Sequence, residues 1–331
     1  MLCMWGGATM GYKLAGYDVV GCNEIDQRVA ECYTVNHNPK YCFVEPIQAF
    51  KTREDLPKEL YSLDILDGSP PCSSFSISGN RSQDWGKEKL FREGQATQVL
   101  DTLFFDFIDL AARLKPKVVV SENVKGLLIG DAKDYVRKIY SKFDEAGYYC
   151  QHFLLNSATM GVPQNRERVF FICLRKDLAT EFLYAADMFT MLPKIDMTFK
   201  ELPIPFQKID TDQKEGDCNF SPFLNRHFDR WKPGTAYSEV NKSGFNYIKA
   251  DPDKVIGTIL AHPDSGTYHH KYRRQLNSHE YKLGGTYPLD YNFLKEKPKY
   301  LVGMSVPPVM TAQIAKRIYD TWLSKLNKPC Q

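Results

Sequence analysis

The stretch KVVVSEN, residues 117 to 123, contains three consecutive valines directly after Pro116. A short, uninterrupted β-branched run of this kind is typical of a strand buried on both faces of a sheet. The segment before Pro116 has apolar residues at helical spacing: Leu100, Leu103, Phe104, Phe107, Ala111 and Leu114. A helix that ends at a proline and is followed by a buried strand indicates an α/β fold.

The same alternation extends over the first 175 residues. Further strand-like runs lie at 17–23, 63–68, 148–155 and 168–175, and helix-like segments at 26–36 and 131–146. We therefore expect a mostly parallel sheet with helices on both faces. The alternation of strand-like and helix-like segments ends near Lys176. Apolar residues at helical spacing return only at 309–326.

Residues 187–300 are rich in proline, glycine, asparagine, aspartate and aromatic residues. Between Arg226 and Lys282, ten Lys and Arg residues stand against six Asp and Glu residues, which gives this part a mild positive bias. The pattern predicts a second, irregular domain.

The composition restricts the class of protein. The chain has 331 residues, of which 43% are hydrophobic and 25% charged, as in ordinary globular proteins. A net charge of +3 hardly favours a polyanionic partner. There is no apolar run of membrane-spanning length and no signal-peptide pattern, so we expect a soluble, intracellular protein. The nine cysteines form no C-x-x-C pair, which predicts reduced thiols and no structural metal site.

One cysteine follows the strand-like run 63–68 within DILDGSPPCSSFS, residues 64–76. Pro70 and Pro71 stiffen the backbone before Cys72, and the carboxyl edge of an α/β sheet is where sites form. Taken alone, Cys72 is either a nucleophile presented on a stiff turn or a small buried residue that fills space.

Two further polar groups stand at strand ends. Glu122 and Asn123 close the valine run, where a carboxyl group either shares a proton with a ring nitrogen or caps a helix. Gln164, Arg166 and Arg168 alternate, so they share one face of a strand, either toward a site or along a solvated edge.

A glycine pair precedes the first predicted helix. Gly6 and Gly7 would allow close backbone approach, and Glu24 at the tip of the next strand could accept hydrogen bonds from ribose hydroxyls. This arrangement suits a nucleoside ligand, although glycine turns before helices are common.

In chain order, these blocks resemble the DNA (cytosine-5) methyltransferase family over most of the chain. The resemblance is carried by SPPC, ENV and QNRER, with QLNSHEYKLGGTYPLDY (275–291) and VGMSVPP (302–308) further along. It implies a Rossmann-like, class I S-adenosylmethionine-dependent methyltransferase fold. Residues 1–185 and 301–331 would form the catalytic domain and residues 186–300 a smaller, irregular target-recognition domain.

The resemblance also implies a reaction: transfer of a methyl group from S-adenosylmethionine to carbon 5 of a flipped-out cytosine in a specific double-stranded DNA sequence. Cys72 would attack C6 and form a covalent adduct. Glu122 would contact N3 and the amino group, and Arg168 the base carbonyl. Arg166 is included among the catalytic residues, and with Gln164 it would support the pocket. S-adenosylhomocysteine would be the second product.

The family pattern assigns the remaining site residues. DNA contacts would come from the residues Pro71, Ser73, Ser74, Ser76, Gln164, Thr258, Ile259, Arg273 and Arg274. Contacts to the cofactor would come from Leu2, Trp5, Gly6, Gly7, Glu24, Ile25, Glu45, Ile47, Pro70 and Ser305. We expect a cytoplasmic, bacterial or phage-encoded monomer that needs no metal and no membrane.

Three positions depart from the family pattern, all near the predicted cofactor site. Met4 stands in place of a glycine, the acid of the first block has no counterpart, and Met304 replaces an asparagine. Either the natural chain begins upstream of Met1 and includes a further strand, or the protein has diverged and binds DNA without modifying it. A tRNA cytosine-5 methyltransferase is the other alternative. The DNA sequence that is recognised cannot be derived from the residues.

Overall fold

The computed structural model describes residues 6–70, 88–89, 98–99, 102–129, 132–183, 192–214, 221–242, 247–262 and 265–326. The strands are β1 (Gly21–Glu24), β2 (Tyr41–Val44), β3 (Ile65–Gly68), β4 (Glu88–Lys89), β5 (Gln98–Val99), β6 (Val118–Val124), β7 (Tyr148–Asn156), β8 (Glu167–Arg175), β9 (Tyr247–Lys249) and β10 (Gly266–Tyr268).

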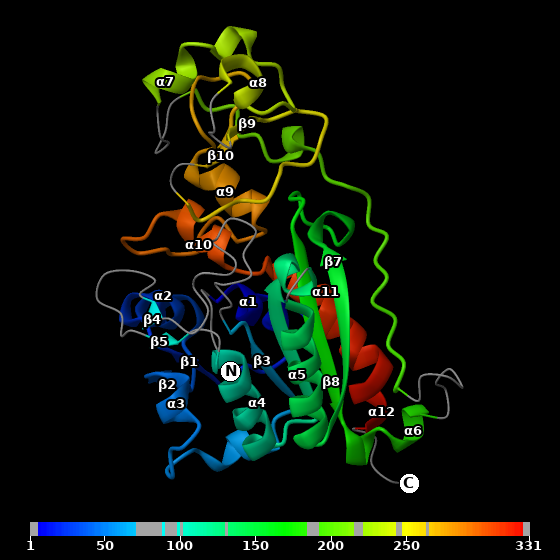
Figure 1. Cartoon of the computed structure of the whole chain (residues 1–331). Coiled ribbons are helices and arrows are strands. Elements are labelled where there is room, and N and C mark those ends of the chain that lie inside the picture. The colour runs from blue at the N-terminus through cyan, green and yellow to red at the C-terminus, as the bar shows by residue number, and fades with distance from the viewer. Residues whose placement is uncertain are drawn as a thin grey trace.

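The helices lie between these strands and after them (Figure 1). They are α1 (Gly7–Leu14), α2 (Gln27–His37), α3 (Ile47–Phe50), α4 (Leu103–Leu114), α5 (Ala132–Glu145), α6 (Thr180–Leu183), α7 (Pro222–Asn225), α8 (Ser238–Asn241), α9 (Ser278–Gly284), α10 (Pro298–Met304), α11 (Pro308–Ile318) and α12 (Ser324–Leu326). Among these helices, none combines the length and the apolar character that a bilayer-spanning segment needs.

The main sheet has four strands in the order β3-β6-β8-β7. β3 and β6 run parallel, whereas β6 and β8, and β7 and β8, run antiparallel. The expectation of a mostly parallel sheet is therefore wrong for this sheet, which is mixed. The physical reason is the short connection 157–166 between β7 and β8, because a parallel return needs a longer crossover. A second, two-stranded sheet pairs β1 and β2 in parallel.

Each face of the main sheet carries its own hydrophobic core. On one face, alternate residues of β6 and β8, such as Val119 and Phe171, pack with α3, α4 and α5. On the other face, the intervening residues, such as Val120 and Ile172, pack with α11 and the chain that follows it. Strands covered on both sides explain why their sequences are almost continuously apolar.

Helices α1 and α2 lie together on the α11 side. The Thr9 hydroxyl is 3.1 Å from the Tyr33 hydroxyl, and Lys13 donates a hydrogen bond to the His37 carbonyl. α1 also packs along α11, and α2 is capped by Asp26, whose carboxylate accepts from two backbone N–H groups of the first turn. The first glycine turn and the end of β1 are thereby fixed against the C-terminal helix.

The chain after β8 returns along the molecule as extended residues 192–205 and then forms the small elements β9, β10 and α7 to α10 beyond one end of the sheet (Figure 1). Phe206, Leu276 and Leu301 of this region share one buried cluster with Val29 and Cys32 of α2. The irregular region is thus packed directly on the N-terminal part of the chain.

A substitution at Gly68, the last residue of β3, tests the packing of this strand against α4. A Cβ atom there would lie 2.5 Å from the Phe107 ring of α4, closer than atoms can approach. We expect Gly68→Ala to lower the free energy of unfolding by about 1–3 kcal/mol. Chemical denaturation of Gly68→Ala, Phe107→Leu and the double variant is the measurement. Phe107→Leu should cost less in the Gly68→Ala background, and strictly additive costs would contradict the contact.

Candidate active site

Glu122 and Arg168 meet at the carboxyl end of β6. The antiparallel register places Val124 opposite Arg168 and Glu122 opposite Phe170, so the two charged side chains are diagonal neighbours on one face. Arg168 Nε lies 2.9 Å from Glu122 Oε1, and the side chains are 16% and 11% exposed. Burial lowers the pKa of Arg168, while the Glu122 carboxylate opposes that shift. The pair forms a fixed, nearly buried charge couple.

Asn123 connects this pair to the predicted nucleophile loop. Its Nδ2 donates to the Pro70 carbonyl at 3.1 Å, while its Oδ1 accepts from the Val124 N–H at 2.8 Å. Pro70 itself is buried. The end of β3 and the end of β6 are therefore joined by a side-chain hydrogen bond. The predicted site residues Leu2, Trp5, Pro71, Cys72, Ser73, Ser74 and Ser76 lie outside the described part of the chain.

Gln164 and Arg166 connect β8 to the irregular region. The Gln164 amide donates to the Gly284 carbonyl at 3.1 Å and accepts from the Ile259 N–H at 3.0 Å. Arg166 Nη1 donates to the Gly303 carbonyl at 3.1 Å and, more weakly, to the Ile259 carbonyl at 3.4 Å. Both side chains are buried, and burial lowers the pKa of the Arg166 guanidinium. These contacts make Arg166 a supporting residue.

Thr258 and Ile259 lie against the segment 164–166, which leads into β8. The Thr258 hydroxyl donates to the Asn165 carbonyl at 2.7 Å, and the Asn165 N–H donates to the Ile256 carbonyl. Thr258 is partly exposed, whereas Ile259 is buried. The structure thus brings together the two segments that the sequence predicts to border the target base.

The two arginines predicted to contact phosphates differ. Arg273 is 52% exposed and pairs with the exposed Asp229. Arg274 is 3% exposed and makes a two-pronged pair with the buried Glu280, and its remaining donors reach backbone carbonyls of Gln213 and Gln275. A guanidinium that is almost fully buried and whose donors are used in this way is not available to a phosphate, which argues against the DNA contact predicted for Arg274. Arg274 instead fixes the start of α9.

The glycine turn lies against the C-terminal block. Gly6 has φ = 67°, a left-handed conformation that suits glycine. A Cβ atom on Gly7 would lie 2.4 Å from the Val306 carbonyl and 2.6 Å from the Tyr287 hydroxyl, which donates to the Ser305 hydroxyl at 2.7 Å. The first and last predicted cofactor segments are therefore in direct contact.

The acids at the ends of β1 and β2 are neighbours. Glu24 Oε1 accepts from the N–H groups of Ile25 and Asp26, and the Glu24 carbonyl accepts from the Glu45 N–H. Burial raises the pKa of Glu24 to about 8, against the effect of the two N–H donors. Glu45 pairs with Arg53 at 2.9 Å, and Ile47 is buried in the core under α4.

Asp67 and Tyr12 form a buried polar contact that the sequence patterns did not indicate. Asp67 lies in β3, is 5% exposed and accepts a hydrogen bond of 3.2 Å from the Tyr12 hydroxyl. Burial raises the pKa of Asp67 to about 7, the Tyr12 hydrogen bond lowers it, and the nearby Glu122 raises it further. An acid inside an otherwise apolar strand, one residue before a glycine, is the signal that could have found this group.

A further polar cluster lies in the irregular region. Ligand atoms of Asp210, His269 and His270 fall within 4.8 Å of one another. However, His269 Nδ1 accepts from the backbone N–H groups of Lys271 and Tyr272, so its proton is on Nε2 and points to Asp210 at 3.1 Å. A protonated nitrogen does not ligate a metal, and the arrangement is that of a hydrogen-bonded structural cluster.

The fold and the site together define an α/β enzyme class. A glycine turn and an acidic strand end suit a nucleotide-like cofactor, and a carboxylate–arginine couple stands at the end of neighbouring strands. The match to a family model then gives the identity. Residues 1–320 match the C-5 cytosine-specific DNA methylase family, and the chain belongs to that family, whose members use S-adenosylmethionine.

Individual relatives are bacterial and viral proteins. The chain is 25% identical to type II methyltransferase M.DdeI of Desulfomicrobium norvegicum, with 95% of this chain and 86% of the relative covered. It is 27% identical to M.Bsp6I of Bacillus sp. strain RFL6, with 96% of each covered. The orphan methyltransferase M.SPRI of Bacillus phage SPR is 35% identical over 49% of this chain and 34% of the relative.

Solved structures share the fold at lower identity. A DNA modification methyltransferase encoded within a prophage of E. coli superposes with a TM-score of 0.68, at 18% identity and 97% coverage of both chains. DNMT2 of Spodoptera frugiperda gives a TM-score of 0.66, at 17% identity, with 96% of this chain and 97% of the other covered.

Arg166 provides a test of the link between β8 and the irregular region. Arg166→Met keeps the aliphatic stem but leaves the buried Gly303 and Ile259 carbonyls without their donor. We expect a loss of about 2–4 kcal/mol in the free energy of unfolding. Urea unfolding measures this loss. Arg137→Met, at a position about 80% exposed, is the control and should change stability by less than about 0.5 kcal/mol. An equal effect of both variants would contradict the assignment.

The raised pKa of Glu24 predicts that the stability of the protein depends on pH. The folded protein holds this proton up to about pH 8, whereas the unfolded chain releases it near 4.5, so stability falls as the pH rises across that interval. Glu24→Gln removes this contribution, and its Tm should fall several degrees less than that of the wild type between pH 5 and pH 8. Scanning calorimetry at both pH values measures the difference, with the exposed Glu31→Gln as control. An equal fall in Tm for the wild type and Glu24→Gln would contradict the raised pKa of Glu24.

Proposed function

We propose that this protein methylates carbon 5 of cytosine within a specific double-stranded DNA sequence, through a covalent bond from Cys72 to C6 of a flipped-out base. The observation that carries the proposal is the hydrogen bond from Asn123 to the Pro70 carbonyl. It ties the chain two residues before Cys72 to the strand end that bears Glu122. This hydrogen bond supports a site in which Cys72 and Glu122 act on the same base.

The charge couple suits a cytosine ring. Glu122 would contact N3 and the amino group of the base, while Arg168 would donate to the base carbonyl. Because the two side chains already contact each other at 2.9 Å, they are oriented before the base arrives. Attack of the Cys72 thiolate on C6 then raises the electron density on C5. C5 would then take the methyl group as the bond from the methyl carbon to the cofactor's sulfonium sulfur breaks. Transfer of the C5 proton to a base and departure of the Cys72 thiolate from C6 would restore the aromatic ring.

The residues near Gly6 and Glu24 fit the cofactor of the family. The glycine turn leaves no room for a Cβ atom against Val306, and the Glu24 carboxylate stands at the end of β1 with one oxygen bound by two N–H groups. Gly6, Gly7, Glu24, Ile25, Glu45, Ile47, Pro70 and Ser305 would hold S-adenosylmethionine. The bound cofactor supplies an electrophilic methyl group, and this chain supplies the hydrogen-bond acceptors for its hydroxyls.

The irregular region would read the DNA. We assign residues 1–185 and 301–331 to the catalytic domain and residues 186–300 to target recognition. Contacts of Gln164 and Arg166 with Ile259 hold the second part against the base-binding strand. Thr258 and the exposed Arg273 remain available for the DNA backbone. Extruding the base costs a few kcal/mol, which these contacts would offset.

Labelled cofactor tests the substrate class. Purified protein is incubated with S-adenosylmethionine carrying a tritiated methyl group and either host-type genomic DNA or bulk tRNA. We expect transfer to DNA that is at least about tenfold faster than to tRNA, and DNA binding that weakens steeply with salt. Transfer to tRNA alone, or salt-sensitive DNA binding without any transfer, would contradict the proposal. Size-exclusion chromatography of the same sample tests action as a monomer.

Covalent capture tests the nucleophile. Duplex DNA that carries 5-fluorocytosine at the methylated position should trap the enzyme, because fluorine cannot leave as the C5 proton does. Cys72→Ser should abolish the adduct, and Cys42→Ser, at an exposed free cysteine, should retain it. An adduct that survives Cys72→Ser would overturn the assignment of the nucleophile.

A further inference from the structure

The strands β1 and β2 place two cysteines directly opposite each other. Their parallel register pairs Cys22 with Cys42, and the two Sγ atoms lie 3.5 Å apart. Opposed residues on neighbouring strands have Cα atoms about 4.8 Å apart, which is within the range that a disulfide spans. Because a disulfide bond is about 2.0 Å long, the two sulfur atoms need only a small approach to form one.

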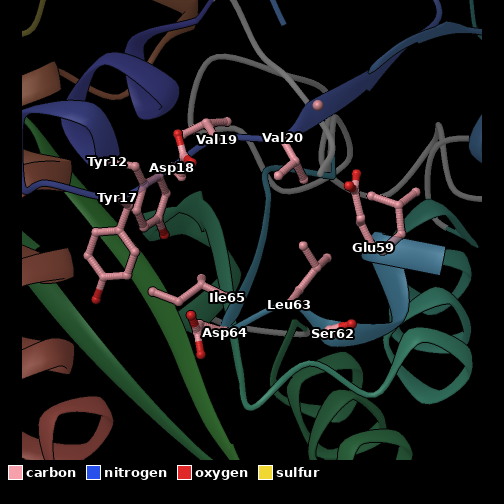
Figure 2. Close-up of a pocket in the computed structure, with 12 residues that line it drawn as sticks. Tyr12, Tyr17, Asp18, Val19, Val20, Glu59, Ser62, Leu63, Asp64 and Ile65 are labelled. Carbon is pink, nitrogen blue, oxygen red and sulfur yellow. The ribbon is translucent and has the colours of Figure 1, made fainter. Parts of the chain in front are cut away.

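Contacts on either side of the two cysteines hold the strands in this register. Asn23 donates from Nδ2 to the Phe43 carbonyl at 3.1 Å and to the Glu45 carbonyl at 2.8 Å. At the start of β2, the Tyr41 hydroxyl donates to Glu59 at 2.9 Å, and Glu59 lines a cavity of about 250 Å³ near the start of β1 (Figure 2). The two sulfur atoms are therefore brought together by the backbone and do not depend on a chance rotamer.

The two thiols differ in their access to solvent. Cys22 is 2% exposed and packs against Tyr33 of α2, whereas Cys42 is exposed. The Cys22 thiol donates to the Cys42 sulfur, and the Thr34 hydroxyl of α2 donates to the same sulfur at 3.8 Å. Cys42 is therefore the thiol that an oxidant in solution reaches, and Cys22 stands directly behind it.

The surroundings of Cys42 set the speed at which it reacts. Desolvation of the sulfur, and then the neighbouring Cys22 thiol, raise the pKa of Cys42 to about 11. The Thr34 hydrogen bond lowers this pKa, and the Glu24 carboxylate raises it. Since the thiolate is the reactive form, Cys42 reacts slowly at neutral pH and faster as the pH rises.

We propose that Cys22 and Cys42 form a redox site, at which a small-molecule disulfide such as glutathione disulfide oxidises the two thiols to one intrachain disulfide. The Cys42 thiolate attacks one sulfur of glutathione disulfide, which releases one glutathione thiolate and leaves a mixed disulfide on Cys42. The Cys22 thiolate then attacks the Cys42 sulfur and releases the second glutathione thiolate. The two protein thiols lose two protons and two electrons, and the two glutathione thiols take them up.

The disulfide would restrain the strand pair. Among the described residues, β2 pairs with β1 alone, so a covalent link between the two strands opposes their separation. Glu24 and Glu45 stand at the ends of these strands, and oxidation would also restrain these two acids. A role of that restraint in cofactor binding rests on the proposed function, whereas the redox site itself does not.

Peptide mapping tests the site. The reduced protein is incubated with glutathione disulfide at about pH 8.5, where more of the thiolate is present, then alkylated and digested with trypsin without reduction. Trypsin separates the nearby cysteines, because Cys22 lies in residues 14–28, Cys32 in residues 29–40 and Cys42 in residues 41–51. Mass spectrometry should find residues 14–28 joined to residues 41–51 in most chains, and dithiothreitol should separate them.

Single substitutions distinguish the two steps. Cys22→Ser should stop the reaction at the mixed disulfide and retain one glutathione on Cys42. Cys42→Ser should leave Cys22 without glutathione, because Cys22 is buried. Cys150 and Cys173 are the matched control, since they face each other across β7 and β8 but are 5% and 0% exposed, and they should stay reduced.

Three results of the mapping would overturn the proposal. The first is wild-type protein that retains glutathione on Cys42 without a link to Cys22. The second is a link from Cys42 to Cys32 in place of Cys22. The third is equal oxidation of Cys150 and Cys173, which would show that the reaction follows unfolding and not the geometry of β1 and β2.

Hydrogen exchange tests the restraint on the strands. Exchange in residues 41–44 should slow at least about fivefold on oxidation of the wild type, and should not change in Cys42→Ser treated in the same way. Unchanged exchange in the linked protein would contradict the restraint. Neither mapping nor exchange requires DNA or cofactor, so failure here is distinct from failure of methyl transfer.

Discussion

The antiparallel register between β6 and β8 is the constraint on which the rest of the site depends. Val124 stands opposite Arg168, and from this pairing follows the diagonal contact of Arg168 with Glu122. A slip by one residue would turn Arg168 to the other face and would also expose the buried faces of both strands. The register is therefore held by the two hydrophobic cores, and the charge couple is placed by them.

Polar residues next to this strand pair connect it to both halves of the chain. Toward the N-terminal half, Asn123 follows Glu122 in β6 and holds the Pro70 carbonyl. Toward the C-terminal half, Gln164 and Arg166 precede β8 and hold Ile259, Gly284 and Gly303. The segments that we propose for base binding and DNA recognition are thus connected to the adjacent strands β6 and β8. A folded protein with this arrangement orients the groups before a substrate binds, which lowers the cost of reaching the transition state.

Local patterns predicted much of this structure. The runs 117–123 and 168–175 form β6 and β8 almost as expected, because buried strands and amphipathic helices have distinct periods. The antiparallel direction of β7 and β8 was not predicted, since strand order and direction depend on loop length and tertiary pairing. Two side-chain contacts that no local pattern indicates were also missed: Tyr12 with Asp67, 55 residues apart, and Arg274 with Glu280, six residues apart. An arginine in an irregular, positively charged segment has the same sequence signature whether it faces a phosphate or a buried glutamate.

We propose that Glu122 and Arg168 act as one unit on the target base. A double-mutant cycle measures this most directly, with Glu122→Gln, Arg168→Met and the double variant compared by the rate of covalent capture on 5-fluorocytosine DNA. We expect strong non-additivity, in which the second substitution costs much less than it does alone, because each residue orients the other. Independent, additive losses would contradict it and would show that the 2.9 Å contact serves the fold alone.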